Sequence, residues 1–571
     1  MYLRGSVRAL ALAAVGLFAI SACGGNGAPS GQLAPADKQI LNVNDGTEPN
    51  SYDPSQESYT YEAGVSRQVF ETLLKSNQAG TDVEAAAATS YDVSSDGLTY
   101  TFHLRSAKWS DGKPVTAADF VYGYKHLLNP ALAAPYVDPF FDTTIKGADG
   151  YASVDVTKAD AIDTFLSGLG LAAPDTNTFT ITLQHPAAFF KWVVTLWVAE
   201  PLRQDVVESA AGGSFPSSDT AKPEIWAQKS STIIGNGPFM ISEIQSKDHV
   251  TLVPNPNYWG GAPHLQKIVE WFIQDANTAY AKYQTGDLDA ITVPVADVDA
   301  VRNDPTLSKQ AKVYPKLTTF WMTFNAQEKP FDNQDVRMAF SKSIDRDKLN
   351  KNVQHNIQQS IQSFIPKGMA GYDNSNNAQS FDPTAAKALL QKAGVTADQL
   401  NKFKLLTRNT TRNQTLNQFI VQQWNTNLGL NMQLEVVDSK TVTDRIRKSQ
   451  FDIYGPDGWG ADYPDQQDWF DIFFTNSCGS LNWGCVQKTG GLQGYDQLVQ
   501  QADTEQDQGK RNSMYKQAQD MLINQAAVAF IFQDYEYNLI KPYVGGLKIT
   551  ASDDQSLPGD LFWHDAYINS H

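Results

Sequence analysis

The chain has 571 residues, of which 42% are hydrophobic and 11% aromatic, a composition typical of a globular protein and too apolar for intrinsic disorder. Its formal net charge of −17 excludes a broad nucleic-acid surface, because phosphate binding requires a concentrated basic face. At roughly 100 to 200 residues per domain, a chain of this length is expected to form about two to four domains.

The N-terminus has the pattern of an export signal. Two arginines precede an apolar run over residues 9–20 that is too short to span a bilayer comfortably. The run ends in Ser-Ala-Cys, which resembles the bacterial lipobox, whose cysteine receives a diacylglycerol. We therefore expect a signal peptide over 1–22, a lipid on Cys23 and a flexible, polar tether over 23–38. An ordinary secretory signal is the alternative interpretation.

Strands and helices alternate along the rest of the chain. Residues 98–104 and 179–183 alternate polar and apolar side chains, as half-buried strands do. Capping residues and C-terminal glycines predict three helices, one beginning after Thr116, one over 383–394 and one over 413–429. This interleaving predicts layered α/β domains.

Two further cysteines, Cys478 and Cys485, lie in one loop rich in glycine, serine and asparagine. In an exported chain, two cysteines this close together predict a local disulfide, which would stabilise the fold by roughly 2 to 3 kcal/mol. A zinc site is the alternative, but no neighbouring histidine or second cysteine pair supplies the other ligands. We expect neither a metal nor a cofactor.

The sequence contains none of the common catalytic motifs. It lacks the serine-hydrolase elbow, the zinc-protease helix, the nucleotide P-loop and the dinucleotide fingerprint. The histidines are scattered singly. A glycosidase-like carboxylate pair such as Asp457 and Asp462 stays open as an alternative, but we expect a binding protein rather than an enzyme.

Three segments carry a family resemblance. Residues 61–126 predict a strand, an Asp-Gly turn and a capped helix (YEAGVSRQVFETLLKSN, then LTYTFHLRSAKWSDGKPVTAADFVYGYKH). In the second segment, GNGPF followed by HVTLVPNPNYWG, Gly235 and Gly237 are interpreted as giving a turn its conformational freedom. The third segment, residues 451–465, reads FDIYGPDGWGADYPD. Together they resemble the oligopeptide- and dipeptide-binding proteins of ABC importers, solute-binding protein family 5.

The resemblance implies a large α/β, bilobed fold of the periplasmic-binding-protein type, class II, with an extra subdomain inserted in lobe one. Mapping by the motifs assigns lobe one to 39–82, 197–310 and 525–571. The inserted subdomain would hold 83–196, and lobe two 311–524.

The same resemblance implies a ligand site. In peptide-binding members, the aspartate that matches Asp462 receives the ligand's α-ammonium, and the backbone that matches Gly458, Trp459 and Gly460 pairs with the peptide like an added strand. Glu62 matches a family position that helps to hold the amino end. Without the resemblance, Asp462 would be interpreted as a turn residue and Trp459 as a core residue.

One departure from the family concerns the ligand's carboxylate. Some members carry an arginine three residues before the motif tryptophan, where this chain has Pro456. Arg408 and Arg412 lie in a predicted strand-to-helix passage that would face either the cleft or solvent, so neither is assigned.

We therefore expect an extracytoplasmic, lipid-anchored monomer, on a cell membrane or in a periplasm, that captures short peptides for an ABC permease and its ATPase. The alternatives keep the fold and change the role: binding of a nickel chelate, an oligosaccharide or an antibiotic, or action as a sensor.

Overall fold

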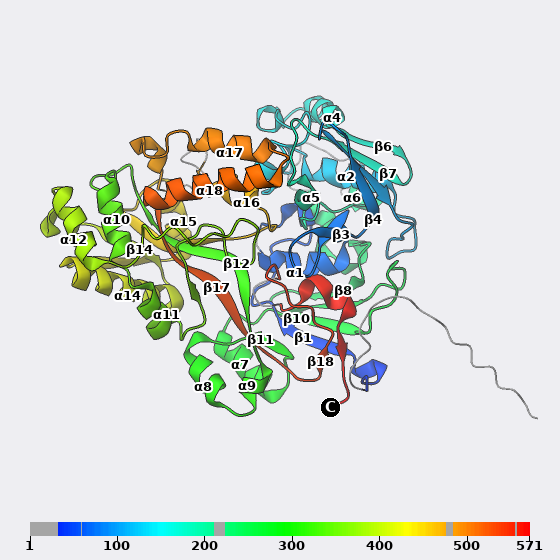
Figure 1. Ribbon diagram of the computed structural model, residues 1–571. Helices are drawn as coiled ribbons and strands as arrows, with labels where there is room; N and C mark the ends of the chain where they lie inside the picture. The colour runs from blue at the N-terminus through cyan, green and yellow to red at the C-terminus, as the bar shows by residue number, and fades with distance from the viewer. Residues whose placement is uncertain (1–31, 59, 211–222, 475–483, 554–556) are drawn as a thin grey trace, which may run out of the picture.

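The computed structural model describes residues 32–58, 60–210, 223–474, 484–553 and 557–571. Figure 1 shows two lobes, joined by long strands that run from one to the other. The predicted signal peptide and Cys23 lie outside the described residues, as does Cys478. In the part of the chain that is described, no helix is both long and apolar enough to cross a membrane.

The first lobe contains a mixed sheet with the strand order β1–β10–β9–β8. Its strands are β1 (Ile40–Asn44), β10 (Lys267–Trp271), β9 (His249–Pro254) and β8 (Phe239–Gln245). The pairing of β1 with β10 is parallel, and the other pairings are antiparallel. Segments more than two hundred residues apart therefore form this lobe together.

A second, antiparallel sheet lies at one end of the first lobe, with the order β4–β5–β7–β6. Its strands are β4 (Ala88–Val93), β5 (Thr99–Leu104), β7 (Thr178–Thr182) and β6 (Leu171–Asp175). The strands predicted at 98–104 and 179–183 are thus confirmed, and Phe102 and Phe179 stand opposite each other in the buried face. Short strands complete this half: β2 (Leu74–Ser76), β3 (Val83–Ala85), β18 (Val544–Gly545) and β19 (Tyr567–Ile568).

Helix α2 (Ala117–Leu127) begins where the capping pattern predicts it. The Asp119 carboxylate accepts a hydrogen bond of 2.7 Å from the Thr116 backbone N–H, which satisfies a donor at the helix start. The other helices before the long strands are α1 (Thr60–Val69), α3 (Val137–Phe140), α4 (Ala159–Gly168), α5 (Phe190–Val193), α6 (Gln204–Ala210), α7 (Ala276–Thr285), α8 (Val298–Asn303) and α9 (Leu307–Gln310).

The interpretation of Gly235 and Gly237 as sources of turn freedom is wrong. Neither residue has a positive φ. A Cβ on Gly235 would lie 1.9 Å from the Val69 carbonyl oxygen, and one on Gly237 would lie 2.7 Å from another backbone carbonyl of α1. Asn236, between them, exchanges hydrogen bonds of 2.9 and 3.0 Å with the backbone of Glu71. Close packing against the end of α1 therefore requires these glycines.

The second lobe is organised around a sheet with the order β11–β17–β12–β16–β14–β15, with β13 paired to β17. Its strands are β11 (Ala290–Thr292), β17 (Val528–Ile540), β12 (Ala311–Phe324), β16 (Ile453–Gly460), β14 (Lys404–Arg408), β15 (Gln433–Val437) and β13 (Gln359–Ser360). Strands β12 and β17 are paired antiparallel, and the far end of β17 pairs with β11 beside the first lobe. These two strands connect the lobes (Figure 1).

Both helices predicted for this lobe are confirmed. Helix α12 (Pro383–Lys392) has Asp382 as its N-cap, and Gly394 follows it with a positive φ. Helix α14 (Thr411–Leu428) starts two residues earlier than predicted and ends at Gly429 in the left-handed conformation. The remaining helices are α10 (Gln334–Lys342), α11 (Arg346–Val353), α13 (Ala397–Leu400), α15 (Ser439–Arg447), α16 (Gln467–Phe474), α17 (Tyr495–Thr504) and α18 (Gln508–Asn524).

Hydrophobic packing does not separate the inserted sheet from the first lobe. One continuous core joins the β4–β7 sheet to the β1–β10 sheet, so the predicted boundaries of the subdomain stay a prediction. Tyr463, from the loop after β16, is also buried in this core, with its ring centroid 5.5 Å from that of Phe140. The second lobe therefore contacts the first through the predicted ligand motif.

Candidate functional site

The sheet places the predicted motif at the junction of the two lobes. Strand β16 pairs with β12 along its length, with Trp459 opposite Thr319. Its other edge pairs with β14 only through Ile453 and Tyr454. From Asp457 to Gly460, no described strand pairs with that second edge.

Gly458 and Gly460 allow β16 to lie close to β12. A Cβ on Gly458 would be 2.7 Å from the Thr319 carbonyl oxygen, and one on Gly460 would be 3.0 Å from Thr318 Oγ1. The backbone that comes close at Gly458 and the side chain that comes close at Gly460 therefore both belong to β12. A ligand that pairs with this segment of β16 like an added strand would approach along its other edge.

Asp462 lies two residues beyond β16, and one of its two carboxylate oxygens accepts a hydrogen bond. The Tyr136 hydroxyl donates a hydrogen bond of 3.0 Å to Asp462 Oδ1. Asp462 Oδ2 is buried and has no hydrogen-bond partner among the described residues. The Asp462 backbone N–H donates to Asp468 Oδ2 at 2.9 Å, and the Trp459 indole N–H donates to the same oxygen at 3.3 Å. Asp468 thus fixes both the tryptophan and the aspartate.

Burial makes the charge of Asp462 unfavourable. It raises the pKa of Asp462 to about 7, although the hydrogen bond from Tyr136 and the positive charge of Arg67 lower it in part. The pKa of Asp468 is also raised, first by burial and then by the charge of Asp462. Two carboxyl groups therefore share a region with little compensating positive charge, which favours the binding of a cation.

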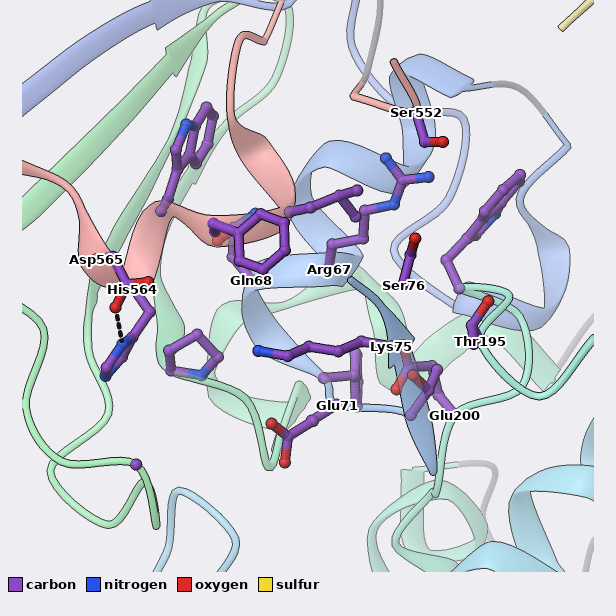
Figure 2. A pocket seen from close by; sticks show the side chains of 18 of the residues that line it. Arg67, Gln68, Glu71, Lys75, Ser76, Thr195, Glu200, Ser552, His564 and Asp565 are labelled. Atoms are coloured by element: carbon purple, nitrogen blue, oxygen red, sulfur yellow. Dashed lines mark hydrogen bonds and ion pairs between the residues drawn. The ribbon is translucent and has the colours of Figure 1, made fainter. Parts of the chain in front are cut away.

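Two cavities meet at Asp462. The first, the strand cavity, is about 270 Å³ and is lined by residues of β12 and by the residues from Gly458 to Asp462. The second, the first-lobe cavity, is about 250 Å³ and extends under Arg67 toward Glu71 and Glu200 (Figure 2). Arg67, Trp197, Asp462 and Ser552 line both. The two cavities are therefore neighbours, and these four residues border both.

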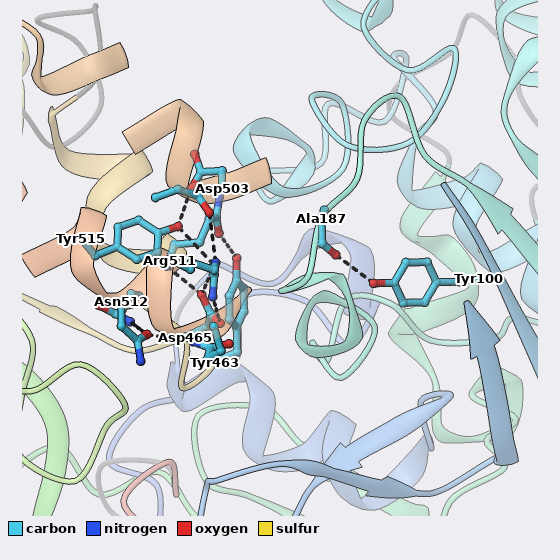
Figure 3. Close-up of polar contacts among 12 residues, drawn as sticks. Tyr100, Ala187, Tyr463, Asp465, Asp503, Arg511, Asn512 and Tyr515 are labelled. Atoms are coloured by element: carbon cyan, nitrogen blue, oxygen red, sulfur yellow. Dashed lines mark hydrogen bonds and ion pairs between the residues drawn. The ribbon is translucent and has the colours of Figure 1, made fainter. Parts of the chain in front are cut away.

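The loop that carries Asp462 is fastened to α18. Arg511, which is 1% exposed, donates hydrogen bonds of 2.8 and 2.7 Å to the two carboxylate oxygens of Asp465. The same guanidinium donates to Tyr515 Oη at 3.1 Å, and the Tyr515 hydroxyl donates to Asp503. Figure 3 shows this network beside Tyr463. A bidentate ion pair therefore holds the motif loop in place.

Glu62 is buried in α1 but lines neither cavity. Its carboxylate accepts hydrogen bonds from the Asn50 backbone and side chain at 3.1 and 2.7 Å, and from the Ser58 N–H at 2.6 Å. Ser58 does line the strand cavity. The geometry gives Glu62 a role in holding the loop at the cleft, and direct contact with a ligand stays a prediction.

The two unassigned arginines are engaged with other side chains of the second lobe. Arg408 donates to Tyr454 Oη at 3.1 Å, and Arg412 donates to Asp534 Oδ1 at 3.2 Å. Neither lines the two cavities. The predicted disulfide is partly visible: Cys485 is buried and disulfide-bonded, but its expected partner lies outside the described residues, so the pairing stays a prediction.

Sequence reasoning missed three residues of the cleft. Tyr136 belongs to a loop without a motif, and its partner Asp462 is 326 residues further along the chain. Arg67 lies within the first family segment, but nothing in that segment marks it as facing the cleft. Trp197 forms a wall of both cavities, and the Arg67 guanidinium lies 5.3 Å from its ring centroid. Only the fold brings these side chains to Asp462.

Known proteins resemble the chain along most of its length. Residues 82–480 match the family described as "Bacterial extracellular solute-binding proteins, family 5 Middle". The oligopeptide-binding protein OppA of Bacillus subtilis (strain 168) is 28% identical over 527 residues, which cover 90% of this chain and 91% of that protein. The "Probable deoxycholate-binding periplasmic protein YgiS" of Escherichia coli (strain K12) is 27% identical over 547 residues, covering 94% and 95%.

A solved structure extends the likeness to three dimensions. Haemophilus influenzae OppA, in complex with the peptide RPPGFSPFR, superposes with a TM-score of 0.75 at 26% identity, covering 94% of this chain and 100% of the other. The bilobed α/β fold expected from the sequence is thereby confirmed. Because the family match spans more than half of the chain, the chain belongs to the bacterial extracellular solute-binding proteins of family 5.

Proposed function

We propose that this protein captures short peptides in the cleft between its lobes and delivers them to an ABC importer. The observation that carries the proposal is the carboxylate of Asp462, whose Oδ2 is buried and without a hydrogen-bond partner among the described residues. It lies next to the open edge of β16. A carboxylate that can accept a hydrogen bond from a cation, beside a strand edge, suits a peptide with a free amino terminus.

In this proposal, the ligand's α-ammonium donates to Asp462 Oδ2 while Tyr136 holds Oδ1. The peptide backbone pairs with the residues from Gly458 to Gly460, which provides affinity without reading side chains. A charge-assisted hydrogen bond of this kind contributes about 1.5 to 3 kcal/mol and fixes the register of the peptide at its amino end. The relative OppA is named for oligopeptides, and its Haemophilus counterpart was solved with one, which supports the same cargo here.

Ligand binding would favour the arrangement in which the two lobes are closed on the ligand. Asp462 belongs to the second lobe and Tyr136 to the first, so a ligand between them stabilises the arrangement in which both contact it. We infer that the closed, loaded protein is the form that docks on a permease, and that a separate ATPase drives transport. The protein itself performs no chemistry on its cargo, and we infer that a lipid on Cys23 anchors it outside the cytoplasm.

Asp462→Ala tests the site. We expect the variant to fold normally and to lose at least about tenfold in affinity for a free tripeptide such as Ala-Ala-Ala, because the ammonium loses its charged acceptor. Isothermal titration calorimetry measures the affinity, with Asp444→Asn, an exposed carboxylate on α15, as the control.

N-acetylation of the peptide tests the same contact by removing the ligand's ammonium instead of the protein's carboxylate. N-acetyl-Ala-Ala-Ala has no ammonium and is expected not to bind the unaltered protein. Equal affinity of the acetylated and free peptides, or unchanged affinity in Asp462→Ala, would contradict the proposal. Because one relative is named for deoxycholate, that compound is included; tight binding of deoxycholate with no binding of tripeptides would establish a different cargo.

A further inference from the structure

We propose that the first-lobe cavity is a specificity site for a second positive charge, carried by a basic side chain on the first residue of the ligand and received by Glu200. The inference deepens the proposed peptide function and rests on it. It would make peptides that begin with lysine or arginine the preferred cargo.

Glu200 is a carboxylate that the protein leaves without a partner. The residue is 3% exposed and lines the first-lobe cavity. Its carboxylate makes no hydrogen bond or ion pair with any residue in the described part of the chain, and Oε2 is fully buried. A buried carboxylate without a partner is costly for a fold, so its presence in a cavity wall indicates a ligand group that completes it.

The position of Glu200 is fixed by its backbone. Helix α2 packs so closely against it that a Cβ on Gly123 would lie 2.1 Å from the Glu200 carbonyl oxygen. Two residues further on, the Leu202 N–H donates to the Asp119 carbonyl at 3.2 Å. The carboxylate is therefore presented to the cavity by a rigid segment.

The charged groups around Glu200 do not compensate it. Glu57 and Glu71 add negative charge and, after burial, raise its pKa well above the usual range, and only Arg67 acts in the other direction. The Arg67 guanidinium is already paired with Asp560 at 2.9 Å. Lys75 and Arg105 act on Glu71, so within this cluster Glu200 is the carboxyl that has no cation paired with it among the described residues.

The cavity has the shape and walls that a basic side chain needs. Its volume is about 250 Å³, and Asp462, where the ligand's first residue would sit, lines both this cavity and the strand cavity. Aromatic rings line it, among them Trp197, Tyr258, Trp259 and Phe562. The apolar stem of lysine or arginine would pack on these rings while its charge reaches Glu200. Lys75 also lines the cavity (Figure 2). Its ammonium pairs with Glu84 at 3.4 Å and lies 5.3 Å from the Phe562 ring centroid.

The experiment compares tripeptides that differ only at the first side chain. We expect Lys-Ala-Ala to bind at least about tenfold tighter than norleucine-Ala-Ala, which has the same stem without the charge. In Glu200→Gln, this tenfold preference should disappear while the affinity for Ala-Ala-Ala changes less than about twofold. Glu243→Gln, an exposed residue on β8, removes the same charge elsewhere and should keep the preference.

The outcomes separate this inference from the function on which it rests. Equal affinities for the lysine and norleucine peptides, or a preference that survives in Glu200→Gln, would overturn the inference while tripeptide binding stands. If no free tripeptide binds, both proposals fail. If 1,5-diaminopentane alone binds as tightly as Lys-Ala-Ala, the second charge does not belong to a peptide side chain and the inference is wrong. Because glutamine is isosteric and neutral, we expect the melting temperature of Glu200→Gln to equal or exceed that of the unaltered protein.

Discussion

At the scale of single residues, Asp462 is a carboxyl group whose surroundings oppose its charge until a cation arrives. Burial raises its pKa to about 7 in the unliganded cleft. An ammonium next to Oδ2 would lower that pKa, because an opposite charge stabilises the ionised form. Ligand binding and proton loss are thus linked.

We expect peptide affinity to fall as the pH drops below about 7. Below the pKa of the free carboxyl, a proton must leave before the ammonium can bind, so the dissociation constant should rise by up to about tenfold per pH unit. Above about pH 8 affinity should fall again, because the peptide's α-amino group, with a pKa of roughly 7.7 to 8.0, loses its own proton. Calorimetry with Ala-Ala-Ala from pH 5 to 9 measures the loss of affinity at low pH and at high pH. An affinity that is the same at pH 5 and pH 7 would contradict the linkage.

At the scale of the element, the two glycines of β16 should respond differently to the same substitution. A Cβ at Gly458 meets a backbone carbonyl at 2.7 Å, whereas at Gly460 the nearest atom is the Thr318 hydroxyl oxygen at 3.0 Å, which can rotate away. We expect Gly458→Ala to lower the free energy of unfolding by about 1 to 3 kcal/mol and Gly460→Ala by less than about 1 kcal/mol. Urea unfolding followed by tryptophan fluorescence compares them. Equal losses would show that β12 does not set the requirement for glycine.

The loop after β16 depends on a helix far along the chain. Arg511→Met leaves the Asp465 carboxylate without its guanidinium in a largely buried place, so we expect a loss of about 3 to 5 kcal/mol in unfolding free energy. Peptide affinity should fall as well, because Asp462 is on the same loop. Lys510→Met, the exposed neighbour on α18, serves as the control and should stay within about 0.5 kcal/mol. Normal stability of Arg511→Met in chemical denaturation would refute this account of the loop.

At the scale of the whole molecule, Tyr136 couples the lobes through Asp462. Tyr136→Phe keeps the ring, which packs against Phe140 and Trp197 with centroid distances of 5.6 and 5.2 Å, and removes only the hydroxyl. We expect about tenfold weaker peptide binding, because a hydrogen bond to a charged carboxylate is lost across the cleft.

Tyr122→Phe provides the matched control. Its hydroxyl is also buried and has no hydrogen-bond partner among the described residues, but it lies on α2 away from Asp462. Calorimetry should give this variant the affinity of the unaltered protein. If both tyrosine variants bind alike, the contact between the lobes does not contribute to capture.

Local sequence was enough to predict the elements whose signals are local. The Asp119 cap of α2, the Gly429 end of α14 and the alternation of β5 all depend on residues within a few positions of one another. The glycines were harder to interpret. The local sequence around Gly235 predicts a turn residue. Glycine is required there because the end of α1, more than 160 residues earlier in the chain, leaves no room for a Cβ.

The sequence by itself determined the family, the bilobed α/β fold and the segment that carries Asp462, because motifs and periodicity are written in consecutive residues. Tertiary structure alone decided what surrounds that aspartate. Tyr136, Arg67 and Glu200 reach the cleft from distant segments, and only folding removes their water and brings their charges together. Burial and charge balance are properties of a three-dimensional neighbourhood, so Asp462 Oδ2 and Glu200 Oε2, which have no hydrogen-bond partner among the described residues, became visible only in the folded chain.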